Sequence, residues 1–133
     1  MLDNYIRCAY IHRVHIDPAE VESLLRLPPA TFHILLALAA EERHGYAIIQ
    51  DVLLRTDGEV RLSAGTLYRS VQRMQEQGLI QESRRRPAPD EDDERRRYYL
   101  LTPFGEAVAK AEARRLTQLV RLARESGFAP GRA

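Results

Sequence analysis

The sequence predicts a mainly α-helical fold with a small β-hairpin, an α+β class, and three observations lead to it. Apolar residues recur at helical spacing in several segments between residues 31 and 125. Residues 63–80 form the clearest of these segments, because suitable capping residues stand at both ends. Two extended segments rich in arginine and tyrosine follow at once. A capped helix followed by a basic hairpin is the order of a winged helix-turn-helix, here with one more helix at the C-terminus.

Length and composition indicate one small domain. The chain has 133 residues, of which 44% are hydrophobic, enough for one core with short appendages. Its longest apolar run, residues 34–40, is far shorter than the ~20 residues of a membrane span. No charged segment followed by a long apolar stretch opens the chain, as a secretory signal would. We therefore expect a soluble, cytoplasmic protein without a membrane partner.

The residues that carry enzyme or metal chemistry are sparse. Cys8, His12 and His15 could supply three ligands to zinc, but no fourth Cys or His ligand lies nearby. No Ser, His and acid arrangement and no phosphate-binding glycine loop occurs. We therefore predict no metal, no cofactor and no enzymatic activity.

The N-terminal extension, residues 1–27, shows no clear period before residue 17. Asp17 is suited to cap a short helix with Pro18 at its first helical position. We expect this helix to end at Leu27, because the residue before a proline disfavours the helical conformation.

The winged domain is expected over residues 28–102. Its first helix should span 31–43 and its second should begin at Gly45-Tyr46 and stop near Gly58. Residues 60–62 are interpreted either as a brief strand or as an extended linker.

The helix from Ser63 has the features of a recognition helix. The Ser63 hydroxyl can cap its first turn and Gly78 can end it. Its inward face is apolar, with residues at i, i+4 and i+7: Leu67, Val71 and Met74. Its other faces carry many hydrogen-bond donors, as a surface that reads a DNA groove requires.

The expected hairpin has strands at 79–86 and 94–101, separated by a tip rich in proline and acidic residues, 87–93. The whole chain has a formal net charge of only +1, so the distribution of charge matters more than its sum. Residues 63–102 hold eight arginines against seven acidic residues, five of which lie in the run 90–94. Without that run the unit is strongly basic.

The last helix should run from Phe104 to Glu125 within a segment 103–126, before a frayed tail at 127–133. It has an apolar stripe that a domain of this size does not obviously cover. Pairing with the same helix of a second copy would cover the stripe, and folding back on its own domain is the alternative. The dimerisation residues that we predict are Phe104, Ala109, Ala113, Leu116, Leu119, Val120 and Ala123.

In order and spacing, five short segments resemble the PadR family of transcriptional regulators, in its smaller subgroup with one C-terminal helix. They are Ile34-Leu-Leu-Ala-Leu38, His44-Gly-Tyr-Ala-Ile48, Gly65-Thr-Leu-Tyr68, Gly78-Leu-Ile80 and Arg97-Tyr-Tyr-Leu-Leu-Thr102. The resemblance implies a homodimeric repressor that binds double-stranded DNA at an inverted-repeat operator and that, in many members, releases it when a small-molecule effector binds. Departures from the family pattern include Ala64 and Arg69, both at positions where proline is common in the family.

The resemblance, the donor-rich face and the arginine triplets together give a set of predicted DNA-binding residues. We expect Arg69 and Arg73 at base edges, and Ser63, Thr66 and Tyr68 at phosphates. The complete set is Tyr46, Ser63, Thr66, Tyr68, Arg69, Gln72, Arg73, Arg84, Arg85, Arg86, Arg95, Arg96 and Arg97.

Several alternatives stay open on the sequence. The outer face of the recognition helix could be an ordinary solvated surface, Tyr68 could pack at the helix start, and the arginine triplets could pair with the acidic tip. A winged-helix module that binds a protein instead of DNA is the alternative function. Any effector pocket should lie between two copies, lined by residues such as Phe32, Phe104 and Leu116.

Overall fold

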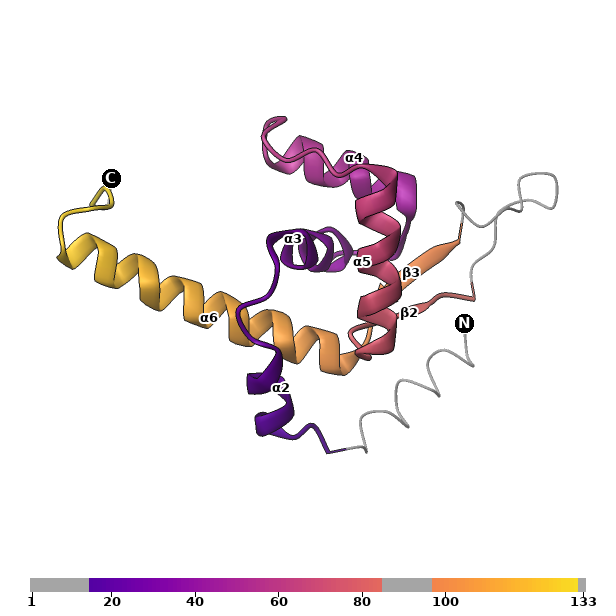
Figure 1. Ribbon diagram of the computed structural model, residues 1–133, viewed down its shortest axis with the longest axis horizontal. Helices are drawn as coiled ribbons and strands as arrows, with labels where there is room; N and C mark the ends of the chain where they lie inside the picture. Colours follow the sequence, from indigo (N-terminus) through magenta and orange to yellow (C-terminus); the bar gives the residue numbers. More distant parts are fainter. Residues whose placement is uncertain (1–14, 85–96, 132–133) are drawn as a thin grey trace.

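The computed structural model describes residues 15–84 and 97–131. Within these ranges the helices and strands follow one another in the order of a winged helix-turn-helix (Figure 1). They are α2 (Pro18–Leu24), α3 (Pro29–Leu38), β1 (Arg43–His44), α4 (Gly45–Arg55), α5 (Ala64–Glu76), β2 (Ile80–Glu82), β3 (Tyr98–Leu101) and α6 (Pro103–Glu125). The mainly helical fold with a small sheet is therefore confirmed.

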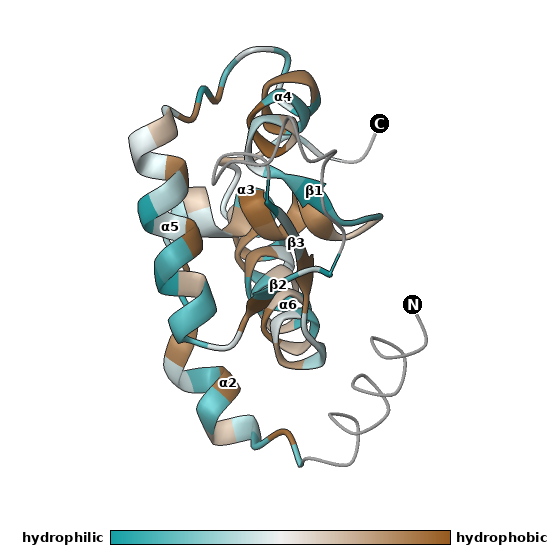
Figure 2. Cartoon of the chain, turned by 90° about the vertical axis from the view of Figure 1, so that its right-hand side faces the viewer, coloured by the Kyte–Doolittle hydropathy of each residue, from teal (hydrophilic) through white to brown (hydrophobic). Residues whose placement is uncertain are grey.

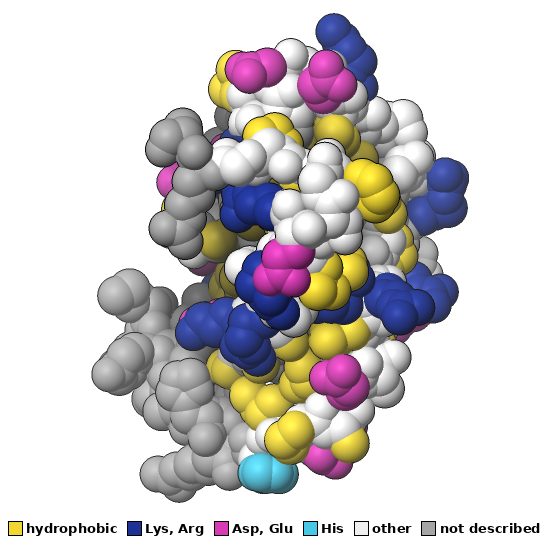
Figure 3. Space-filling model, turned by 90° about the vertical axis from the view of Figure 1, so that its left-hand side faces the viewer, with side chains coloured by type: hydrophobic (Ala, Val, Ile, Leu, Met, Phe, Trp, Pro, Cys, Tyr) yellow, Lys and Arg dark blue, Asp and Glu magenta, His cyan; other side chains and the backbone are white. Residues whose placement is uncertain are grey.

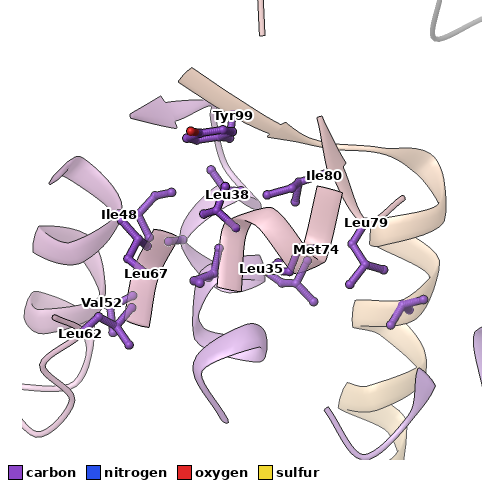
Figure 4. Packing of buried hydrophobic residues seen from close by; sticks show 14 of the residues in the cluster. Leu35, Leu38, Ile48, Val52, Leu62, Leu67, Met74, Leu79, Ile80 and Tyr99 are labelled. Carbon is purple, nitrogen blue, oxygen red and sulfur yellow. The ribbon is translucent and has the colours of Figure 1, made fainter. Parts of the chain in front are cut away.

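The core lies where α3, α4 and α5 meet the small sheet. Ile34, Ile48, Leu67 and Leu79 are fully buried in it. In the close view, Tyr99 of β3 lies over Leu38, above the helices (Figure 4). One core holds the three helices and the base of the wing together, so the recognition helix is fixed on a rigid support.

The α5 helix agrees with its prediction in detail. The Ser63 Oγ accepts a hydrogen bond from the Thr66 backbone N–H at 3.1 Å, and the helix begins at the next residue. Gly78 has a φ of +80°, the left-handed conformation that commonly follows a helix C-terminus. Leu67, Val71 and Met74 are all buried, so the inward face is confirmed.

The sheet has a third strand that the sequence did not predict. Its order is β1-β3-β2, and the short strand β1 pairs antiparallel with β3, with Arg43 opposite Tyr99. The expected helix 31–43 instead begins at Pro29 and ends at Leu38. Residues 39–42 favour helix locally, but the Arg43 Nε donates to the Ala37 carbonyl at 2.7 Å while the backbone of Arg43 joins the sheet. Tertiary pairing overrides local propensity here.

The two hairpin strands and the helix α2 are shorter than expected. The described part of the hairpin is paired from Ile80 to Glu82 and from Tyr98 to Leu101, with Glu82 opposite Tyr99. Residues 60–62 form no strand and are an extended linker. The helix α2 ends at Leu24 instead of Leu27, because Leu25 is extended and Arg26 has a φ of +64°.

The long helix α6 begins at a cap and leaves the domain at its far end. The Thr102 Oγ1 accepts from the Gly105 N–H at 2.9 Å, and Gly127, with a φ of +81°, follows its end. Its first half packs on α2, α3 and β3, whereas its second half projects away from the rest of the described chain (Figure 1). Within residues 15–84 and 97–131, none of the helices could span a membrane.

A buried carboxylate connects α6 to the segment between α2 and α3. Glu112 is 2% exposed and accepts a hydrogen bond from the Leu27 backbone N–H at 3.2 Å. Its two oxygens also receive hydrogen bonds from Arg115 at 2.8 Å each. The Arg115 hydrogen bond, more than any other contact, lowers the pKa of Glu112 against the effect of burial.

Candidate nucleic-acid interface

The predicted DNA-reading residues of α5 lie on the outside of the molecule. Arg69, Gln72 and Arg73 are all exposed, on faces of the helix other than the one that carries Leu67, Val71 and Met74. The helix lies along one side of the molecule, beside the strands and α4 (Figure 2). A Cβ added at Gly65 would lie 3.3 Å from the Arg69 Nη1, so this guanidinium lies over the first turn. The start of α5 therefore presents Arg69 beside the exposed Ser63 and the half-exposed Thr66.

Tyr46 and Tyr68 lie in different environments. Tyr46, in the first turn of α4, is 64% exposed. Tyr68 is half-buried and packs against the core. A Cβ at Gly45 would lie only 2.9 Å from the Tyr68 Cζ and 3.0 Å from the Leu67 Cδ2, so the start of α4 and the start of α5 are in close contact. Packing is thus one role of Tyr68.

His44 holds the start of α4 in place, a role that sequence analysis did not assign. Its Nδ1 accepts the Ala47 N–H at 3.1 Å, and its ring meets Tyr98 of β3 edge-on, with the two centroids 5.2 Å apart. Histidine is not among the common capping residues, so only its position directly before Gly45 could have suggested this. The cap joins the helix that carries Tyr46 to the wing.

The base of the wing holds two of the six predicted arginines. Arg84 is exposed and Arg97 is half-buried. The Arg97 Nη1 donates to both oxygens of Glu82, at 3.2 and 3.4 Å. Arg85, Arg86, Arg95 and Arg96 lie outside the described residues, as do the acidic run 90–94 and the residues Cys8 and His12.

A hollow lies between the recognition helix and the wing base, and we call it the wing notch. Its volume is about 460 Å³. It is lined by Tyr68, Val71, Gln72, Gln75, Glu82, Arg97 and Tyr99. The notch therefore brings predicted DNA-binding residues of α5 and of the wing to one concave surface. Sequence analysis missed Glu82 here, because only the strand register shows which acidic residue faces Arg97.

The comparison with family models shows the family. Residues 34–111, more than half of the chain, match the model of the "Transcriptional regulator PadR-like family". The chain belongs to this family. No curated protein matches the chain.

Solved structures of similar fold include several transcriptional regulators. A PadR family transcription regulator from Clostridium difficile R20291 has a TM-score of 0.62 at 22% identity, covering 74% of this chain and 97% of its own. A transcriptional regulator from Clostridium thermocellum has a TM-score of 0.61 at 23% identity, covering 71% of this chain and 89% of its own. RosR from H. salinarum has a TM-score of 0.55 at 28% identity, covering 73% of this chain and 81% of its own.

The family and the geometry agree on a broad function. Members of the family are transcriptional regulators and not enzymes. The described surface presents a capped helix with exposed arginines beside a wing, which is the arrangement that places a helix in the major groove of DNA. This PadR-family chain is a DNA-binding transcriptional regulator.

Proposed function

We propose that this regulator is a repressor that acts as a homodimer on an inverted-repeat operator. The observation that carries the proposal is the exposed donor set on α5, held on a rigid core beside the wing. Arginine pairs well with guanine and with phosphate, because its planar fork donates two parallel hydrogen bonds. Arg69 and Arg73 contact base edges in this proposal, and Tyr46, Ser63, Thr66 and Tyr68 contact the backbone.

Electrophoretic shift with the DNA upstream of the chain's own gene tests the operator contact. We expect Arg69→Ala and Arg73→Ala each to weaken operator binding by about 1–3 kcal/mol, because each removes a base contact. Arg114→Ala is the matched control, since Arg114 is an exposed arginine of α6 away from α5. Equal affinities for all three variants would remove α5 from the interface.

A promoter–reporter fusion tests repression. If the chain is a repressor, expression of the reporter should rise when the regulator is deleted.

The alternative is a winged-helix module that binds a protein instead of DNA. A chain that neutralises several phosphates loses DNA affinity steeply as salt rises, because condensed counterions are released on binding. A flat response of affinity to salt would favour the protein-binding module.

The second half of α6 supports the homodimer. Leu119 and Val120 are 48% and 43% exposed, and hydrophobic side chains lie among basic ones on the face that carries this end of the helix (Figure 3). Leu116 and Ala123 lie on the same stripe and are half-buried, and Ala109 and Ala113 continue it toward α3. Phe104, at the start of α6, packs partly against the core. A second copy would cover this stripe.

Light scattering tests the homodimer. Leu119→Glu places a charge on the stripe and should convert a dimer into a monomer, because a buried unpaired charge is costly. Gln118→Glu adds the same charge on the opposite side of α6 and should leave the mass unchanged. Equal masses for the two variants would place the interface elsewhere.

A groove beside the stripe is our candidate for an effector site. Its volume is about 330 Å³ and its lining is mainly apolar: Phe32, Leu35, Leu36, Ala39, Leu101, Glu106, Ala109, Lys110 and Ala113. Of the three residues that we expect at an effector pocket, Phe32 lines this groove, whereas Phe104 packs toward the core and Leu116 lies one turn beyond Ala113. Small apolar compounds should release operator DNA, and Phe32→Ala should weaken that release without changing DNA binding in their absence.

A further inference from the structure

Glu82, an acidic residue, lies on the side of the wing base that faces the recognition helix. It is the last residue of β2 and stands opposite Tyr99 of β3, whereas Arg97 lies directly before the first residue of β3, Tyr98. Its side chain is 25% exposed and that of Arg97 is 43% exposed. Arg97 and Tyr99 both line the wing notch.

The wing notch places this ion pair directly beside the recognition helix. Gln72 and Tyr68 form the α5 wall, and Glu82 and Arg97 form the wing wall. DNA that contacts both walls brings a phosphate to the pair. That phosphate attracts Arg97 and is repelled by Glu82, so the full attraction is available only when Arg97 exchanges Glu82 for the phosphate.

The backbone of the wing base is held by contacts other than the Glu82–Arg97 ion pair. The backbone ladder pairs residues 80–82 with residues 99–101. The next residue, Ser83, is anchored separately: its N–H donates to the Tyr98 carbonyl at 2.7 Å and its Oγ donates to the Glu42 Oε1 at 2.6 Å. Neutralising Glu82 therefore removes its charge and leaves the backbone ladder and the Ser83 contacts in place.

We propose that Glu82 is a specificity-determining residue that holds Arg97 away from the DNA backbone and so lowers the affinity for non-operator DNA. This inference rests on the proposed DNA contact of α5 and the wing. A partly exposed ion pair contributes only about 0–1 kcal/mol, so it yields to a well-placed phosphate at the operator. On non-operator DNA the other protein–DNA contacts are too weak to compensate for breaking the Glu82–Arg97 pair. Specificity is a difference of affinities, and a group that disfavours the wrong partner increases it.

The test measures binding of the full chain to a 25-base-pair duplex of random sequence by fluorescence anisotropy over a range of salt concentrations. We expect Glu82→Gln to bind this duplex about 3- to 10-fold more tightly at low salt and to have a slope of log affinity against log salt that is steeper by about one, the effect of one more phosphate contact. Glu82→Asp keeps the charge and should resemble the unmodified chain. In the double variant Glu82→Gln with Arg97→Gln, the steeper slope should disappear, because the released guanidinium makes the new contact.

A charge-matched control variant and thermal unfolding separate the proposed effect from a change in net charge and from a loss of stability. Glu125→Gln also removes one negative charge and releases one arginine, Arg121, but on the exposed end of α6. If Glu125→Gln tightens binding as much as Glu82→Gln, the effect is one of net charge and the inference is wrong. Unchanged or weaker binding by Glu82→Gln, with a thermal midpoint equal to that of the unmodified chain, also overturns it. If the unmodified chain itself fails to bind the duplex at any salt concentration, the DNA contact fails and this inference fails with it.

Discussion

At the scale of single residues, the packing of α4 against the recognition helix α5 depends on one position where the two helices are in very close contact. Gly45 opens α4 against Tyr68 and Leu67 of α5, and a Cβ there would lie within 3.0 Å of both side chains. Leu67 is fully buried and has little room to move, and the Tyr68 ring packs partly against the same core. The absence of a side chain at this position thus sets how α4 and α5 meet.

Gly45→Ala should therefore lower the free energy of unfolding by about 1–3 kcal/mol, the usual effect of overpacking. Gly65→Ala is the control, because the nearest atom to its new Cβ is the flexible end of Arg69, at 3.3 Å. That substitution should be neutral or stabilising by up to about 1 kcal/mol, since alanine favours helix over glycine. Urea unfolding measures both. Equal stabilities for the two variants would show that α4 and α5 can separate at no cost.

Glu112 gives the molecule a pH dependence with a definite sign. Its hydrogen bonds from Arg115 and Leu27 hold its pKa below the ordinary value of 4.5. A carboxyl with a depressed pKa in the folded state stabilises the fold above its unfolded pKa, and this stability is lost as the pH falls through the folded pKa. The effect therefore lies on the acidic side of the ordinary value.

Glu112→Gln should reduce the free energy of unfolding by about 1–3 kcal/mol at neutral pH, because a charged hydrogen-bond acceptor is lost. The difference from the unmodified chain should begin to shrink below about pH 4.5, where the unfolded chain takes up the proton, and should be lost as the pH falls through the lower pKa of Glu112 in the folded chain. Thermal unfolding at a series of pH values measures this. A difference that stays constant at all pH values would mean that Glu112 acts by packing and not by charge.

At the scale of elements, the sequence predicts best the elements whose signals are local. The helix α5 has its cap, its apolar face and its terminal glycine within sixteen consecutive residues, Ser63 to Gly78, and all three are confirmed. The predicted end of α3 was wrong and the strand β1 was not predicted. Both depend on the pairing of Arg43 with a strand more than fifty residues away in the sequence. The Glu82–Arg97 pair and the wing notch depend on strand register, which the sequence does not show before the fold is known.

The cap of α5 links the stability of this helix to DNA binding. Ser63→Ala should lower the free energy of unfolding by about 1 kcal/mol, because the Thr66 N–H loses its acceptor. Ser63→Asp keeps an acceptor and adds a charge that the helix N-terminus favours, so stability should be retained. Affinity for DNA should nevertheless fall in Ser63→Asp, since the new carboxylate would face phosphate in the interface that we propose. Retained affinity in Ser63→Asp would place this end of α5 away from the DNA backbone.

At the scale of the whole molecule, α6 begins on the winged domain and carries the exposed apolar stripe at its far end. Its first half is held by Thr102, by Glu112 and by the close contact of Gly105 with the Leu79 backbone, whereas Leu119 and Val120 remain outside the described core. A helix fixed at one end and apolar at the other can set the spacing between two recognition helices. For a symmetric dimer on B-DNA, half-sites are expected to be about 34–36 Å apart or a multiple of this distance.

A dimer held by the stripe should have a thermal midpoint that rises with protein concentration, because association stabilises the folded state by mass action. The midpoint of Leu119→Glu should not depend on concentration, and it should equal that of the unmodified chain at high dilution, because the substituted side chain is exposed in the single copy. Gln118→Glu should keep the concentration dependence. Calorimetry over a hundredfold range of concentration measures the three curves. If Leu119→Glu keeps the same dependence as the unmodified chain, the two copies meet at a different surface, and α6 does not set the distance between their recognition helices.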